Sequence, residues 1–231
     1  MRPLLADCAP SGRMRLDALA RWSQDVAYAD IEQAGIDRVA VWVLRRSRIR
    51  VQRFPRFGER FRVETFASGI GRMWAERRTT VRLEGSGEPV VEAVGLWIHL
   101  DPVRWVPCRL TAAEVDLYST SAGDRSPPHR LLHAKPDAVE SQTEWFFRRT
   151  DSDVADHINN AAYWEPLEEE LLGDDGELVE IDAELEFRYP AQPGTVAVLR
   201  AGPYRWITDP DNGELYASIV VTNARTTSGS N

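Results

Sequence analysis

Hydrophobic and polar residues follow two rhythms along the chain, and the same order of rhythms occurs twice. In residues 16–31 apolar side chains recur every three to four positions, which predicts an amphipathic helix that Gly35 would end. Runs rich in β-branched and aromatic residues follow, and they predict strands at 41–51, 61–66, 74–83 and 90–100. The first half therefore reads as one helix followed by four strands.

The second half repeats this plan with an additional strand in front. The residue pattern predicts a strand at 144–149, a helix at 158–172, and strands at 181–189, 196–201, 204–207 and 215–222. Pro166 lies inside the predicted helix, where a proline removes a hydrogen bond, so we expect a kink or break between Tyr163 and Pro166.

Two landmarks share one offset of 135 residues, which indicates a duplicated unit. Ala27-Tyr28 corresponds to Ala162-Tyr163, and Phe54-Pro55 to Tyr189-Pro190. One helix on an antiparallel sheet is an α+β layer, and two copies can pair as a covalent pseudo-dimer. A stretch rich in Ser, Gly and Pro separates them, so we expect domains at 1–118 and 141–231 joined by a linker at 119–140.

The amino-acid composition limits the class of protein and the cellular compartment in which we expect it. The 231 residues are 43% hydrophobic and 28% charged, as in globular proteins, and no run approaches the roughly 18 apolar residues that span a membrane. The N-terminus has no apolar stretch typical of a signal peptide. Cys8 and Cys108 are too few for a disulfide framework and lack metal-site spacing. These features predict a cytoplasmic protein with no metal, no membrane partner and no cofactor.

Charge is unevenly distributed between the halves. Residues 1–110 carry a net charge of +6 and residues 111–231 one of −14. Eight arginines lie between Arg45 and Arg62, where Glu59 is the sole acidic residue. Such a run indicates either an anionic partner or a solvated strand face. Nucleic acid is not expected, because no binding motif accompanies the run and the whole chain is acidic.

The densest polar group stands between a predicted strand and the following helix. It contains Asp153, His157, Asn159 and Asn160. The first amides of a helix can stabilise an oxyanion, and a nearby carboxylate can activate water or attack a carbonyl. Helix capping is the alternative explanation, but it accounts for only one acidic residue. At the offset of 135, Trp22 and Ala18 stand opposite His157 and Asp153, which predicts a single site in the second half.

The string Asp153-x-x-x-His157-Ile158-Asn159-Asn160-x-x-Tyr163 resembles the signature of plant and bacterial acyl-ACP thioesterases. Segments of the first half are similar to that family as well: Gln24-Asp25-Val26-Ala27, Arg50-Val51-Gln52-Arg53-Phe54-Pro55, and Gly95-Leu96-Trp97-Ile98. The likeness spans about residues 11–222. It implies two fused hot-dog domains, each a long helix wrapped by an antiparallel sheet, with acyl-chain binding in the first domain and catalysis in the second.

Residue by residue, the resemblance implies that Asp153 is the base or water-orienting group and that His157 is its hydrogen-bonding partner, while Asn159 and Asn160 organise the site. It also implies that Trp22 and Trp42 line the acyl pocket. Two positions depart from the plant enzymes, which have Asn at the position of Ala155 and Glu-Cys where this chain has Pro190-Ala191.

The implied reaction is hydrolysis of fatty acyl-[acyl carrier protein], with the carrier protein as partner. Alternation along a strand should place Arg46, Arg48 and Arg50 on one face, where they could dock this acidic carrier. Two alternatives stay open: an acyl-CoA thioesterase, and a non-catalytic acyl-binding hot-dog protein. The tandem unit could also form a homodimer.

Overall fold

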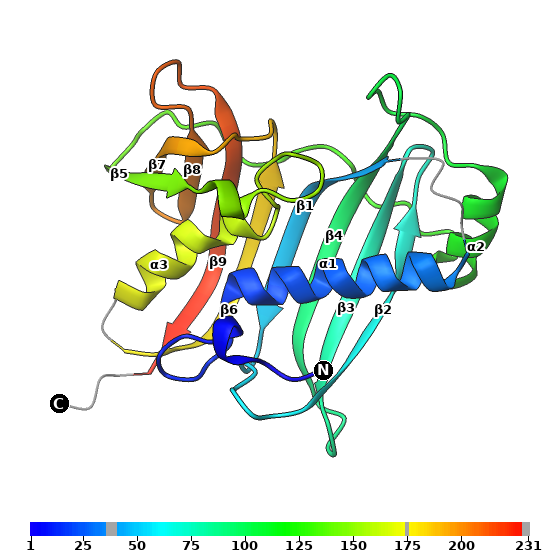
Figure 1. Cartoon of the computed structure of the whole chain (residues 1–231), viewed down its shortest axis with the longest axis horizontal. Helices are drawn as coiled ribbons and strands as arrows, with labels where there is room; N and C mark the ends of the chain where they lie inside the picture. The colour runs from blue at the N-terminus through cyan, green and yellow to red at the C-terminus, as the bar shows by residue number, and fades with distance from the viewer. Residues whose placement is uncertain (36–40, 174–175, 228–231) are drawn as a thin grey trace.

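A computed structural model describes residues 1–35, 41–173 and 176–227. Its strands form one nine-stranded antiparallel sheet in the order β2-β3-β4-β1-β6-β9-β8-β7-β5, and α1 and α3 lie on the same face of this sheet (Figure 1). The expected α+β class with two fused hot-dog units is confirmed. Within the described residues no helix is both long and apolar enough to cross a bilayer.

The first unit wraps four long strands around α1, Leu16–Gln33. The strands are β1 Val41–Val51, β2 Phe61–Ile70, β3 Trp74–Leu83 and β4 Pro89–Leu100. Leu16 and Leu19 of the predicted apolar stripe are buried in the core, and α1 ends at Gln33 just before Gly35, whose φ of +65° suits a glycine. The bounds predicted for β1 and β3 are confirmed.

The second unit has a shorter helix than we expected. Its elements are β5 Ser141–Phe147, a 3-10 turn Ala162–Trp164, α3 Glu165–Gly173, β6 Leu178–Phe187, β7 Gly194–Ala201, β8 Tyr204–Thr208 and β9 Leu215–Thr226. The predicted helical start at Ile158 is wrong, because Ile158 forms an antiparallel bridge with Ser152. The expected break before Pro166 is confirmed: the 3-10 turn gives way to α3 at Glu165, so the proline lies in the first turn of α3, where its missing N–H costs little.

The two units meet where β1 pairs with β6. Arg48 lies opposite Glu184 and Ile49 opposite Ala183. Adding 135 to either β1 residue gives the partner of the other, as expected if a two-fold axis relates the copies. The duplicate therefore supplies the edge that the first sheet lacks.

The segment between the units is ordered against the sheet. It opens with α2, Ala112–Ala122, which sequence analysis did not predict and which extends into the expected linker. Residues 124–140 then cross the sheet face opposite α1, and we call them the strap. The indole N–H of Trp74 donates to the Pro127 carbonyl oxygen at 3.1 Å, and that of Trp206 to Ala134 at 2.7 Å. The fully buried Glu186 carboxylate accepts the backbone N–H groups of Leu132 and His133.

A buried ion pair ties the two helices together. Arg13 Nη2 lies 2.8 Å from Glu168 Oε1 of α3, and both side chains are almost fully buried. The other oxygen of Glu168 accepts the N–H of Leu16, the first residue of α1, at 3.0 Å. Glu168 thus takes the place of an N-cap side chain, which the preceding residue Arg15 does not supply.

We predict that Arg13→Met lowers the free energy of unfolding by about 3–5 kcal/mol, because it leaves the Glu168 carboxylate buried without its cation. Urea denaturation would measure the loss. Arg62→Met is the matched control, since Arg62 pairs with Glu64 in solvent and should contribute little. Equal losses in the two variants would contradict a special role for the buried pair.

Candidate active site

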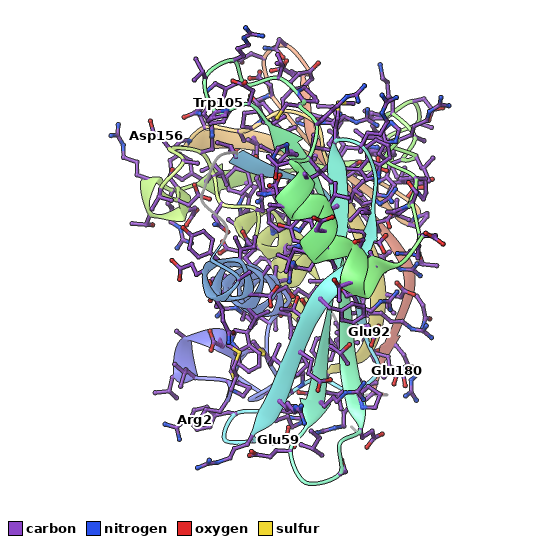
Figure 2. The ribbon with its side chains drawn as sticks, turned by 90° about the vertical axis from the view of Figure 1, so that its right-hand side faces the viewer. Arg2, Glu59, Glu92, Trp105, Asp156 and Glu180 are labelled. Atoms are coloured by element: carbon purple, nitrogen blue, oxygen red, sulfur yellow. The ribbon has the colours of Figure 1, made fainter. Side chains whose placement is uncertain are left out.

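The polar group predicted from the sequence forms a closed loop. The Ser152–Ile158 bridge shuts its base, and the Asp153 N–H donates to the His157 carbonyl oxygen at 3.0 Å. Asp156 is exposed on the side of the molecule where α1 lies (Figure 2) and has a φ of +59°, a conformation that Asp tolerates better than most residues. The expectation that Asn159 and Asn160 begin a helix is wrong, because the loop holds both residues ahead of the 3-10 turn.

Three side chains form a hydrogen-bonded chain across the two units. Asp153 Oδ2 accepts from the amide of Asn159 at 3.0 Å, and Asp153 Oδ1 accepts the N–H of Ala155 at 2.8 Å. Asn159 Oδ1 in turn accepts from Gln24 Nε2 of α1 at 3.2 Å. Each carboxylate oxygen keeps a free lone-pair direction, so Asp153 is held in place and can still accept a proton.

Gln24 adds a residue of the first unit to the group predicted in the second half. Gln24 belongs to one of the first-half segments that resemble the family, but the resemblance implies no role for it. A signal was present, because Gln24 and Asn159 are separated by 135 residues, the offset of the duplication. The two side chains are therefore equivalent positions of the two units, in contact across the two-fold axis.

His157 lies in the loop, but its side chain is not bonded to Asp153. The ring is half-buried and makes no hydrogen bond or ion pair within the part of the chain that the structure describes. Asn159 fills the position that we expected for His157. Ala155, which replaces the asparagine of the plant enzymes, is exposed and contributes its backbone N–H.

A small hollow of about 30 Å³ opens beside this chain, between α1 and the sheet. Gln24, Asn160 and Trp164 line it. Within the described residues the backbone N–H of Asn160 donates no hydrogen bond. Asn160 therefore offers donors to an oxygen atom placed in the hollow.

A larger cavity of about 400 Å³ adjoins the small hollow, because Ala27, Arg77 and Trp97 line both. Most of the residues that line the larger cavity are apolar or aromatic. Val154, which belongs to the loop between Ser152 and Ile158, also lines it. Trp42 is among the lining residues. Trp22 is placed differently: it is 6% exposed and packs in the core, outside the lining of the cavity.

Three of the eight arginines of the run, Arg46, Arg48 and Arg56, form ion pairs with acidic residues of the second half. Arg46, Arg48 and Arg50 share one face of β1, as alternation predicted. Arg48, however, makes a bidentate bond to Asp182 at 2.8 Å. Arg46 donates to carbonyl oxygens of the strap and lies 3.7 Å from Glu184, while Arg50 is exposed and has no ion pair among the described residues. For these three arginines the anionic partner is the chain's own second half.

One group of potential metal ligands occurs in the described residues: His133, Glu184 and Glu186. The two oxygens of Glu186 already accept N–H groups of the strap, and His133 Nδ1 lies 3.0 Å from Ser218 Oγ. These bonds fix the strap to β6 and explain why the residues cluster.

Tyr163 is the last residue of the motif Asp153-x-x-x-His157-Ile158-Asn159-Asn160-x-x-Tyr163, and it is buried beneath the loop that carries the motif. Its hydroxyl accepts the N–H of Ala191 at 2.7 Å, next to the Pro190 that departs from the plant pattern. Burial raises the pKa of Tyr163 to about 12, so the phenol stays protonated at neutral pH and does not serve as a base.

Comparison with known proteins points to one family. Residues 5–118 match the model of the acyl-ACP thioesterase N-terminal domain. An uncharacterized protein of Mycobacterium tuberculosis is 26% identical over 189 residues, which cover 81% of this chain and 75% of that protein.

Two solved structures share the fold over nearly the whole chain. A 12:0-ACP thioesterase from Umbellularia californica has a TM-score of 0.78 at 16% identity, covering 98% of this chain and 96% of that one. An acyl-ACP thioesterase from Bacteroides thetaiotaomicron has a TM-score of 0.74 at 16% identity, covering 96% and 94%. At such identities these likenesses establish the tandem architecture.

We predict that Tyr163→Phe lowers the free energy of unfolding by about 1–3 kcal/mol, because the buried N–H of Ala191 loses its acceptor. Chemical denaturation would measure this loss. Tyr204→Phe is the control, since the Tyr204 hydroxyl makes no hydrogen bond within the described residues and its ring stacking on Trp206 is kept. A Tyr163→Phe protein as stable as the control would contradict the supporting role.

Proposed function

We propose that this chain, which belongs to the acyl-ACP thioesterase family through residues 5–118, hydrolyses the thioester of acyl-[acyl carrier protein] and releases free fatty acid. The family match and the tandem hot-dog architecture support this reaction and make the protein a thioester hydrolase.

One observation from the site carries the proposal. The chain Asp153–Asn159–Gln24 stands beside a small hollow that continues into the apolar cavity of the first unit. The Asp153 carboxylate is therefore linked through Asn159 to Gln24, which lines a hollow that continues into a space suited to a hydrocarbon chain, and hydrolysis of a fatty thioester requires such a base and such a space.

In the mechanism that we propose, the thioester carbonyl enters the small hollow. Asp153 removes a proton from water as the water oxygen attacks the carbonyl carbon, and donors of Asn160 stabilise the oxyanion. Collapse of the tetrahedral intermediate breaks the carbon–sulfur bond. The thiolate sulfur then takes up the proton that Asp153 removed from water, which regenerates the carboxylate. We assign the relay of this proton to His157, whose half-buried ring belongs to the same loop.

Asn159 and Gln24 act as positioning residues in this scheme. Asn159 holds one carboxylate oxygen of Asp153, and Gln24 fixes the orientation of the Asn159 amide. Trp42 contributes to the acyl-chain wall. For Trp22 we retain an indirect role, because it packs within the core on α1, the helix that carries Gln24.

The proposal also covers the domain bounds, the partner, the cellular location and the oligomeric state. We propose an acyl-binding domain at 1–118, a connecting segment at 119–140 and a catalytic domain at 141–231. We propose the acyl carrier protein as partner, the cytoplasm as location in view of the two free thiols, and a homodimer as a possible assembly. Parallel assays with acyl-ACP and acyl-CoA would separate the two carriers, and acyl binding without turnover would favour the binding-protein alternative.

We predict that Asp153→Asn lowers kcat/KM for acyl-ACP by a factor on the order of 100 or more, because the general base is lost while the shape is kept. Steady-state hydrolysis would measure it. The control is Asp25→Asn, since Asp25 follows Gln24 on α1 but is outside the hydrogen-bonded chain. Equal losses at the two positions would refute the assignment of Asp153.

We predict that Arg50→Glu raises KM for acyl-ACP several-fold with kcat nearly unchanged, the pattern of lost uniform binding. Arg50 is the clearest probe because Arg46 and Arg48 already bond to the chain itself. KM should also rise with salt. Arg60→Glu is the control, an exposed arginine of the same run outside β1. If the two variants have equal KM, docking does not use this face of β1.

A further inference from the structure

Among the described residues that line the large cavity, Arg77 is the one with a cationic side chain. Arg77 projects from β3 and is 8% exposed, in a lining otherwise dominated by Ala27, Ile31, Trp42 and Trp97. Burial of a charge is unfavourable unless it is paired. A saturated hydrocarbon chain cannot accept hydrogen bonds from a guanidinium group, so binding such a chain does not explain Arg77 in the wall.

The hydrogen bonds of Arg77 leave part of its guanidinium free. Nη1 donates to Asp30 Oδ2 at 2.6 Å and to Thr65 Oγ1 at 3.3 Å. Within the described residues Nε and Nη2 donate to no side chain or backbone oxygen. Asp30 therefore neutralises the positive charge of Arg77. The N–H groups of Nε and Nη2 remain to donate hydrogen bonds to a ligand in the cavity.

The other lining residues with polar side chains are Tyr28, Glu76 and Tyr118, and the carboxylate of Glu76 bonds to Ser68 and Arg125. Tyr118 of α2 is 5% exposed, and its ring packs edge-on against Trp42 with centroids 6.1 Å apart. Its hydroxyl makes no hydrogen bond within the residues that the structure describes. Burial raises the pKa of Tyr118 and the positive charge of Arg77 opposes this rise, so the two polar groups act on each other electrostatically.

Binding of a plain alkyl chain would remove these groups from water without replacing their partners. Each buried donor left unsatisfied costs about 1–3 kcal/mol. An oxygen atom on the acyl chain would satisfy them. Sites built to bond a substrate oxygen discriminate strongly against the analogue that lacks it.

The position of Arg77 indicates where that oxygen lies. Arg77 also lines the small hollow, together with Gln24 and Asn160, in which we place the thioester carbonyl. The oxygen should therefore be close to the thioester. Because Asp30 already balances Arg77 and Tyr118 is uncharged, a neutral oxygen fits better than a carboxylate.

We propose that Arg77 and Tyr118 form a subsite for an oxygen substituent near the thioester, so that the substrate class is a β-hydroxyacyl or β-ketoacyl group. This inference rests on the proposed hydrolase function. It assigns to both residues contact with the acyl chain and determination of specificity.

The test compares β-hydroxyacyl and saturated acyl thioesters of equal chain length on the same carrier. We expect kcat/KM to favour the hydroxylated substrate by about tenfold or more, equivalent to at least one satisfied hydrogen bond. Tyr118→Phe should reduce this ratio several-fold, mainly through the hydroxylated substrate. The double variant Arg77→Met with Asp30→Asn, which leaves no unpaired acid, should reduce it further.

Tyr204→Phe is the matched control, because it removes a tyrosine hydroxyl outside the cavity and should leave the ratio unchanged. A wild-type ratio near one, or an equal effect of Tyr118→Phe on both substrates, would overturn the subsite while leaving the hydrolase function intact. A preference for a chain that ends in a carboxylate would overturn the choice of a neutral oxygen.

Binding of the free acids gives a readout that does not need turnover. Trp42 and Trp97 line the cavity, so their fluorescence should report occupancy by β-hydroxy and saturated acids. Tighter binding of the hydroxylated acid, lost in Tyr118→Phe, would support the subsite even if every thioester resisted hydrolysis and the proposed function failed. Equal affinities of the two acids would refute it.

Discussion

Backbone hydrogen bonds between β1 and β6 join the two units into one sheet, and the site depends on this junction. The pairing places α1 and α3 on the same face, where Gln24 reaches Asn159 and Arg13 reaches Glu168. A shift of the pairing by one residue would turn the side chains of one strand to the opposite face relative to the other and would separate these contacts. The junction therefore determines the architecture and the alignment of the carboxylate with the acyl cavity.

Sequence patterns predicted those features that depend on local alternation. The bounds of β1 and β3 followed from side-chain periodicity, and the break before Pro166 from the missing N–H of proline. The Asp153 loop was found as a cluster of polar types. Its internal bonding was not, because the Asn159 amide takes the place expected for His157 and is fixed by a residue from the other unit. Such contacts between distant segments leave no periodic signal.

The charge pattern illustrates the same limit. An excess of arginine in one half and of carboxylates in the other suggested an external partner. Several of these opposite charges instead form ion pairs within the chain, including Arg48 with Asp182 and Arg56 with Glu177. The strap lies within residues 119–140, for which the composition predicts a linker. Trp74, Trp206 and Glu186 hold it by bonding to its backbone, which composition alone does not reveal.

The contact between Gln24 and Asn159 has an evolutionary consequence. These positions are equivalent in the two repeats and meet across the two-fold axis. In a homodimer of single units, one codon would specify both sides of this contact, so the same residue would have to bond to itself. Fusion of the copies removed that restriction. One copy could keep an asparagine for the carboxylate while the other acquired a glutamine and an apolar cavity, and each could then diverge without altering its twin.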